Sequence, residues 1–176
     1  MTDQQESTAE PSVPTDRPGE VTTGSPRLDE LAAVALDPDP LPFARLVKRT
    51  PAGELRELMH SVQRRRVLDD LLGRMPDVFR ADRAGSLAAV IHWRIGDRPD
   101  GAVDTYQMVI SGGACVLSPA VDRDPTLTLT LGAVDFLSMV TGNAHAVMLV
   151  MRGRLKTRGD LALTAKFPTL FDPPKA

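Results

Sequence analysis

The chain has 176 residues, 42% of them hydrophobic, which suits a single folded domain and excludes disorder along its whole length. With 21 basic and 23 acidic residues its net charge is −2, which argues against a dedicated nucleic-acid-binding protein. The one cysteine, Cys115, excludes an intrachain disulfide, and with neither a signal peptide nor a long apolar run we expect a soluble, cytoplasmic protein.

The first 26 residues differ in composition from the rest of the chain. They contain four prolines and no leucine, isoleucine or aromatic residue. Five acidic residues against one arginine give this segment a net charge of −4. Because it cannot bury enough apolar surface to offset its ordering entropy, we predict that residues 1–26 form a disordered acidic tail.

Helical periodicity runs from Pro26 to about Ala84, with apolar residues recurring every three or four positions. Proline-containing breaks, the first at 37–40, divide it into short helices, because a residue before proline avoids the α region. The first apolar stripes are too short to form stable helices alone in water. We therefore expect a helical extension over 27–66 that packs against a following domain, 67–172, or against a second copy of the chain in a homodimer.

After Ser86 the apolar period changes to two, which is typical of strands with one buried face. The dipeptide Gly112-Gly113 suits a tight hairpin turn between two of these strands. Short turns favour antiparallel pairing, so the predicted class is α+β. The expected strands and the later helices, in chain order, are 87–95, 106–110, 114–118, 126–131, then helices 132–140 and 144–151, strand 154–157 and helix 161–170.

No combination of residues in this sequence predicts catalysis. The three histidines, His60, His92 and His145, lack a second metal-ligating residue at a suitable spacing. Nucleophile-elbow, phosphate-loop and dinucleotide motifs do not occur. Cys115 alternates with valine in a hairpin strand and is best interpreted as a small buried hydrophobe. We predict no catalytic residue, no metal site and no cofactor.

Two clusters of basic residues have more than one interpretation. The run Arg64–Arg66 covers most of a helical turn and is typical of a solvated helix face. A second set recurs every two residues, so that a strand would direct all its members to one side. This set protects an exposed edge strand from aggregation, or it attracts an anionic headgroup or a membrane surface for transient contact. It consists of Arg152, Arg154, Lys156 and Arg158.

The second half of the chain is rich in methionine and other flexible apolar residues. The run 146–151 is apolar on all sides, which a helix with one buried face does not need. Methionines fill irregular gaps in a core, and they also line surfaces that accept variable apolar ligands. Composition alone leaves both interpretations open.

Residues 67–170 resemble the sterol carrier protein type 2 (sterol-binding) domain family. The similarity starts at 71–79, where a helix ends in Met-Pro-Asp-Val-Phe, and continues through the strand that ends at 92–95. Its most specific parts are 135–143, similar to the family's Asp-Phe-x-x-(Leu/Met)-x-x-Gly helix, and 152–160, similar to its Gly-(Lys/Arg)-Leu-Lys-x-x-Gly-(Asp/Asn) strand and turn.

The resemblance implies a five-stranded, mainly antiparallel sheet covered by helices, with an apolar tunnel between them. Family members bind sterols, fatty acids and fatty acyl-CoA without catalysis. This chain differs by its N-terminal helical extension and by ending in Pro-Pro-Lys-Ala instead of a peroxisomal Ser-Lys-Leu-like signal, which favours a bacterial setting.

We therefore expect a lipid or other hydrophobic small molecule as the partner. Two alternatives remain: a ligandless protein-interaction module of the same fold, and, with less support, a small enzyme that uses Tyr106 or His92. Periodicity within the matched elements predicts that the tunnel is lined by Ile91, Trp93, Met108, Ile110, Leu127, Leu129, Phe136, Met139, Val140, Val147, Met148, Met151 and Phe167.

Overall fold

The computed structural model describes residues 26–175. The predicted tail, 1–26, lies outside these residues except for its last one, Pro26, which begins a helix. Asp39 explains where the second helix starts, because its side chain accepts a hydrogen bond from the backbone N–H of Leu41 at 3.0 Å. The three helices of the extension are α1 (Pro26–Ala35), α2 (Pro40–Arg49) and α3 (Ala52–His60).

The fourth helix, α4 (Arg64–Arg74), carries a strong apolar stripe whose leucines are buried. It tightens into the 3-10 helix η1 (Met75–Val78) at Pro76, as a residue without a backbone N–H requires. The short helix α5 (Ala81–Ala84) then leads to the sheet.

The five strands form one mixed sheet in the order β3-β2-β1-β4-β5. Only the central pair β1–β4 is parallel, and the other three pairs are antiparallel. The predicted α+β class with a mainly antiparallel sheet is therefore confirmed. The strands are β1 (Ala89–Ile95), β2 (Asp104–Ser111), β3 (Ala114–Leu117), β4 (Leu127–Leu131) and β5 (Leu155–Gly159).

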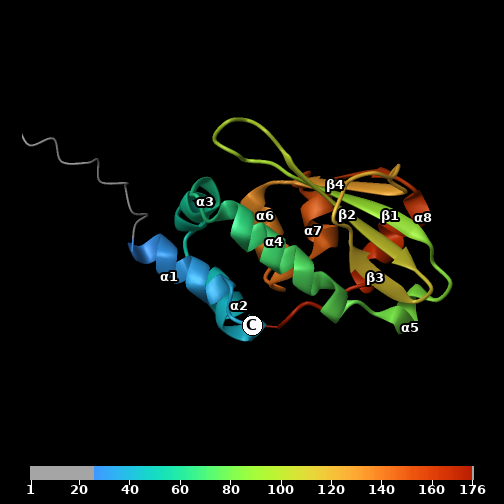
Figure 1. Ribbon diagram of the computed structural model, residues 1–176, viewed down its shortest axis with the longest axis horizontal. Helices are drawn as coiled ribbons and strands as arrows, with labels where there is room; N and C mark the ends of the chain where they lie inside the picture. The colour runs from blue at the N-terminus through green and yellow to red at the C-terminus, as the bar shows by residue number, and fades with distance from the viewer. Residues whose placement is uncertain (1–25, 176) are drawn as a thin grey trace, which may run out of the picture.

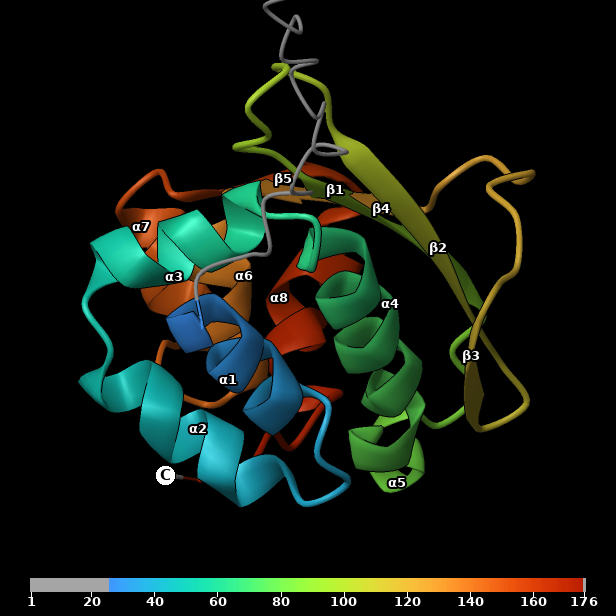
Figure 2. The same ribbon diagram turned by 60° about the vertical axis from the view of Figure 1, so that its left-hand side comes forward.

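The labelled helices lie on one side of the sheet (Figure 2). The alternation of buried and exposed residues along the strands matches this arrangement. In β1, Ile91, Trp93 and Ile95 are buried on the helix side, and Arg94 is exposed on the other side. The remaining helices are α6 (Ala133–Val140), α7 (Ala146–Met151), α8 (Leu161–Lys166) and the 3-10 helix η2 (Phe167–Thr169).

The helical extension packs on the rest of the chain. Helices α1–α3 gather at one end of the molecule (Figure 1), where α2 and α3 contact α6 and α1 contacts α4. The side-chain amide of Asn143 donates a hydrogen bond to the carbonyl oxygen of Ala44 at 2.8 Å. One buried apolar cluster runs from Leu31 in α1 to Leu170 near the C-terminus. The apolar stripes of the extension are therefore buried within this chain.

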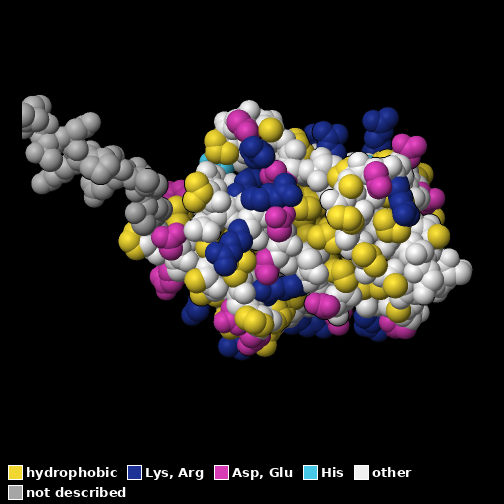
Figure 3. Space-filling view, in the orientation of Figure 1, with side chains coloured by type: hydrophobic (Ala, Val, Ile, Leu, Met, Phe, Trp, Pro, Cys, Tyr) yellow, Lys and Arg dark blue, Asp and Glu magenta, His cyan; other side chains and the backbone are white. Residues whose placement is uncertain are grey.

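In the basic run Arg64–Arg66, Arg65 and Arg66 are exposed as expected of a solvated face, and only Arg64 differs. Arg64 is buried, and its Nε lies 2.7 Å from a carboxylate oxygen of Asp104. Arg65 pairs with Asp69 at 2.9 Å and stacks over Tyr106, with its guanidinium carbon 5.3 Å from the ring centre. Basic and acidic side chains are interspersed over this region (Figure 3), as expected where cations are paired locally.

Candidate functional site

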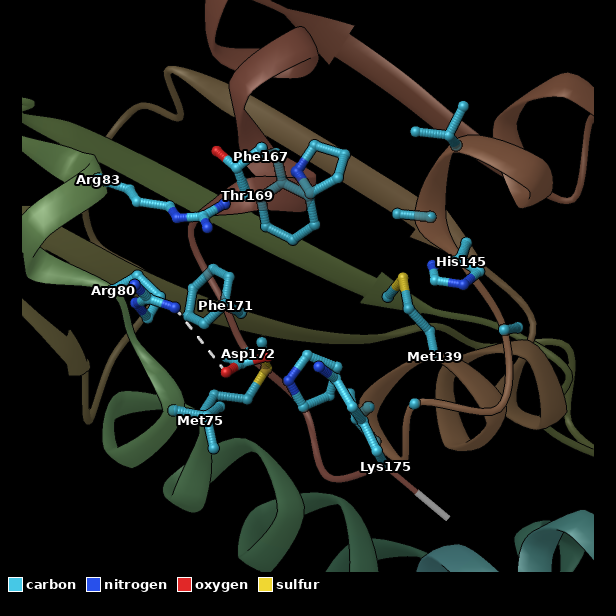
Figure 4. A pocket seen from close by; sticks show the side chains of 18 of the residues that line it. Met75, Arg80, Arg83, Met139, His145, Phe167, Thr169, Phe171, Asp172 and Lys175 are labelled. Atoms are coloured by element: carbon cyan, nitrogen blue, oxygen red, sulfur yellow. Dashed lines mark ion pairs between the residues drawn. The ribbon is translucent and has the colours of Figure 1, made fainter.

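A cavity of about 290 Å³ lies between the inner face of the sheet and the helices. Its walls come from η1 and α5, from the α6–α7 connection, from η2 and from the C-terminal segment 171–175, with Trp93 of β1 at the sheet. Figure 4 shows Arg80 and Arg83 on one side of the cavity, with Met139 and His145 on the other.

The C-terminal segment is fixed beside η1 by backbone hydrogen bonds. The N–H of Arg80 donates to the carbonyl oxygen of Leu170 at 2.7 Å, and the N–H of Asp172 donates to Val78 at 2.9 Å. Between them, Phe79 and Phe171 form an isolated antiparallel bridge. These bonds make the last residues of the described chain a wall of the cavity.

The inner part of the cavity is aromatic. The ring of Trp93 meets Phe136 edge-on at a centroid distance of 5.8 Å and Phe167 at 5.6 Å. Phe171 continues the contact series, 5.5 Å from Phe167 and 5.6 Å from Phe79. Such tilted and edge-to-face pairs are favourable beyond their buried area and hold the rings in place. The indole N–H of Trp93 is directed to the sulfur of Met108 at 3.3 Å.

The rim of the cavity carries three basic side chains, Arg80, Arg83 and Lys175, against a single carboxylate, Asp172. The guanidinium of Arg80 already has partners within the chain. It donates hydrogen bonds to both carboxylate oxygens of Asp82, at 2.9 and 2.8 Å, and lies 3.8 Å from a carboxylate oxygen of Asp172. The hydrogen bond from Arg80 lowers the pKa of Asp82. By contrast, the guanidinium of Arg83 makes no hydrogen bond or ion pair with any residue in 26–175.

A second cavity of about 200 Å³ adjoins the first between α7, α8 and β5. The two cavities share Ala146, Val147, Phe167 and Pro168 as lining residues. The other residues that line the second cavity are mainly apolar and include Leu129, Val150 and Met151.

The structure divides the predicted tunnel residues into three groups. Trp93, Met139, Val140, Val147 and Phe167 border the first cavity, and Leu129 and Met151 border the second, together with Val147 and Phe167. Met148 is 43% exposed and borders neither cavity. Five others are buried in the core and border neither cavity: Ile91, Met108, Ile110, Leu127 and Phe136.

The predicted row of four basic residues does not form on one side of a strand. Strand β5 begins at Leu155, so Arg152 and Arg154 lie in the turn before it. Arg154 pairs with Asp135 of α6, with 3.0 Å between Nε and Oδ2. Lys156 and Arg158 do share a face, opposite Thr130 and Thr128 of β4.

Sequence reasoning missed the polar rim and the C-terminal wall. Arg83 lies on a helix of four residues, which is too short to show a periodicity, and Arg80 directly precedes that helix. Phe171 and Lys175 lie beyond the last predicted helix, in a segment without regular structure. The only signal was composition, because 167–175 holds two phenylalanines and three prolines in nine residues.

Tyr106 and His92, the two residues named for a possible enzyme, lie away from the two cavities. The Tyr106 hydroxyl donates to Asp69 at 2.7 Å, and burial raises its pKa. His92 bonds the side chain of Gln107 at 3.2 Å, and neither His92 nor Tyr106 borders the two cavities. Burial raises the pKa of the Cys115 thiol to about 11, which keeps it protonated at neutral pH.

Across residues 26–175, no three His, Cys, Asp or Glu side chains come together in a way that could hold a metal ion. Within the same residues, no helix combines the length and the apolar character that crossing a membrane requires.

Comparison with known proteins points to one family. The model of the SCP-2 sterol transfer family matches residues 68–172, more than half of the chain. Sterol carrier protein 2 from Homo sapiens is 25% identical over 84 residues, covering 48% of this chain and 15% of the human protein. The protein of the same name from Rattus norvegicus is 25% identical over 91 residues, covering 51% of this chain and 17% of the rat protein. The chain thus corresponds to a small part of each curated relative.

Two solved structures align with this chain. Sterol carrier protein 2 from Yarrowia lipolytica, in its apo form, aligns over 59% of this chain and 86% of its own, with 20% identity and a TM-score of 0.45. A double mutant of the sec-alkyl sulfatase PisA1 from Pseudomonas sp. aligns over 84% of this chain and 30% of its own. In that alignment the identity is 12% and the TM-score is 0.50.

Proposed function

This chain belongs to the SCP-2 sterol transfer family, and from this we propose that it binds a lipid in the first cavity without changing it chemically. Binding or transfer of a lipid or sterol is the activity that family membership implies. The finer proposal is that the ligand is an amphiphile, with its hydrocarbon among the aromatic rings and an anionic headgroup at the rim.

The apolar interior supports the first half of this proposal. A hydrocarbon chain that enters the cavity leaves water, which contributes about 0.8 kcal/mol for each CH₂ buried. The first cavity, at about 290 Å³, lies near the lower end of the range for ligand sites. A long acyl chain would therefore extend past Val147 and Phe167 into the second cavity.

The observation that carries the headgroup assignment is Arg83. Its guanidinium is at the rim and makes no bond within 26–175, whereas Arg80 beside it already holds two carboxylates. An arginine accommodates a carboxylate, sulfate or phosphate through paired N–H donors, and Lys175 adds a second positive charge on the same rim. A sterol, which carries a hydroxyl and no charge, would not use these groups.

The test compares two probes with the same tail: a fluorescent fatty acid and the corresponding fatty alcohol. For Arg83→Gln we expect affinity for the acid to fall about ten-fold or more, because a hydrogen bond to a charged group is worth roughly 1.5–3 kcal/mol. Affinity for the alcohol should stay within about two-fold, since its tail contacts are unchanged.

The matched control is Arg94→Gln, an exposed arginine on the opposite face of the sheet. It should change neither affinity. If the wild-type protein binds neither probe, the proposed function is wrong. If Arg83→Gln binds the acid as well as wild type does, Arg83 is not the headgroup residue.

A further inference from the structure

Helix α7 forms a wall of the second cavity, although few of its side chains are packed. Val147, Val150 and Met151 line this cavity, and yet they are 40–75% exposed. Only Ala146 and Leu149 of its six residues are buried. Because a helix of six residues is not stable by itself in water, its position depends on these two side chains and on what holds its ends.

The passage between the two cavities has one firmly held side and one side that belongs to α7. Four residues line both cavities, two from α7 and two from η2: Ala146, Val147, Phe167 and Pro168. The Phe167 ring packs against Trp93 at a centroid distance of 5.6 Å and against Phe171 at 5.5 Å. Displacement of α7 would therefore widen the passage while Phe167 keeps its place.

One residue, Arg154, connects the C-terminal end of α7 to α6. Its N–H donates a hydrogen bond to the carbonyl oxygen of Leu149 at 2.8 Å, so its backbone is continuous with the last turn of α7. Its guanidinium makes two contacts with Asp135 in the first turn of α6, from Nε to Oδ2 at 3.0 Å and from Nη2 to Oδ1 at 2.5 Å. Such a paired contact fixes the orientation of both side chains. We call it the α6–α7 ion pair.

The segment before α7 is held separately from this ion pair. The backbone N–H groups of Asn143 and Ala144 donate to the carbonyl oxygen of Ser138 at 2.8 and 2.9 Å. The side-chain amide of Asn143 donates to Ala44 in the extension. The N-terminal end of α7 thus follows an anchored turn, whereas its C-terminal end is joined to α6 through the side chain of Arg154.

We propose that local opening of α7, limited by the α6–α7 ion pair, is the step that admits an acyl chain to the second cavity and releases it. When the ion pair breaks and Leu149 leaves the core, α7 moves away from Phe167 and the second cavity becomes accessible. The headgroup does not have to move, because neither Arg83 nor Lys175 borders this cavity. The inference rests on the proposed function, since it assigns the route that the hydrocarbon of the same ligand takes.

Stopped-flow fluorescence with a long-chain fluorescent fatty acid tests the proposal. For Arg154→Gln and for Asp135→Asn we expect the association and dissociation rate constants both to rise about three- to five-fold. The loss of a partly exposed ion pair changes an opening equilibrium by about this factor. The dissociation constant should stay within about two-fold of wild type, since the ion pair is closed both before and after binding.

An ion pair that only maintained the shape of the cavity would give a different result. Its loss would raise the dissociation rate constant and the dissociation constant together and leave the association rate constant unchanged. The double variant should match the single variants to within about two-fold, because all three break the same pair. The matched control is Arg152→Gln in the same turn, an exposed arginine without an ion pair to any residue in 26–175, and it should keep the wild-type rate constants.

Hydrogen exchange of the full chain without ligand tests the opening by itself. The amide of Leu149 donates to the carbonyl oxygen of His145 at 3.1 Å, and this bond is lost when the short helix opens. The Leu149 amide should exchange about three- to five-fold faster in Arg154→Gln than in wild type or in Arg152→Gln. Amides of α4 should exchange at the same rate in all three proteins.

Two results would overturn the proposal: unchanged exchange at Leu149 in Arg154→Gln, or an association rate constant equal to that of wild type. Fatty-acid binding with rate constants that Arg154→Gln leaves unchanged would refute the route alone. Wild type that binds no fatty acid would refute the proposed function and, with it, the route.

Discussion

At the scale of single residues, Arg64 joins segments that are far apart in sequence. Its Nη1 donates to the carbonyl oxygen of Met59 at 3.1 Å, and its Nη2 donates to those of Ile95 at 3.1 Å and Gly96 at 2.7 Å. With the ion pair to Asp104, these bonds connect the end of α3 to the ends of β1 and β2. Only arginine offers enough donors in one plane for this set of acceptors.

Replacing Arg64 with methionine should lower the free energy of unfolding by about 3 kcal/mol, because Asp104 and several carbonyl groups lose a buried partner. Arg98, 2.9 Å from the other oxygen of Asp104, keeps the loss near the lower end of the range for buried pairs. Urea denaturation measures the change. The control Arg66→Met, at an exposed neighbour, should stay within about 0.5 kcal/mol; equal stability of the two variants would show that the Arg64 bonds contribute little.

At the scale of elements, the α6–α7 connection and the C-terminal segment together form one wall of the cavity. Gly142 has a φ of +72° in this connection, and a Cβ there would overlap the carbonyl oxygen of Pro174. Gly153, after α7, has a similar φ of +68°, but no atom lies within 4 Å of the position a Cβ would take. A comparison of substitutions at the two glycines therefore distinguishes the effect of backbone strain from the effect of contact with the C-terminal segment.

Both Gly142→Ala and Gly153→Ala should lose about 1 kcal/mol of stability from the left-handed backbone alone. Only Gly142→Ala should also displace 171–175 and thereby weaken binding of the fluorescent fatty acid, because Phe171 and Lys175 leave the cavity wall. Melting curves and binding titrations on the pair distinguish the effects. Equal fatty-acid affinity in both variants would mean that the C-terminal segment does not shape the site.

At the scale of the whole molecule, the extension shares its core with the matched domain. Phe43, Leu55, Leu58 and Met59 are almost completely buried. Their helices, α2 and α3, both contact α1 and α6, and α3 also contacts α4. None of the residues from 26 to 66 borders the first or second cavity. We infer that the extension stabilises the helices above the cavity without contacting the ligand.

Deleting residues 1–60 should therefore expose the faces of α4 and α6 that α1–α3 cover, and the fragment should aggregate or melt well below the full chain. Deleting only residues 1–25 should leave the melting temperature and fatty-acid affinity unchanged, because that segment has no leucine, isoleucine or aromatic residue to pack. Light scattering and melting curves measure both. A 61–176 fragment that stays monomeric and equally stable would show that the extension is an independent unit.

The sequence by itself determined the elements and their class, because local rules govern them. Alternation of leucine and threonine over 127–131 indicates a strand with one buried face, and this segment forms β4, between the central strand β1 and the edge strand β5. Proline marked the helix breaks through its fixed φ and missing N–H. The motifs at 135–143 and 152–160 were sufficient to identify the family that the comparison confirmed.

Only the tertiary structure decided which apolar residues line a cavity and which fill the core. Periodicity reports burial, and Phe136 in the core and Met139 at the cavity have the same local signal. The environment of Arg64 depended on Asp104, forty residues away, and the rim depended on bringing Arg83 and Lys175 to the same cavity. Such long-range pairings arise from how the chain folds back on itself, and no local pattern along the sequence encodes them.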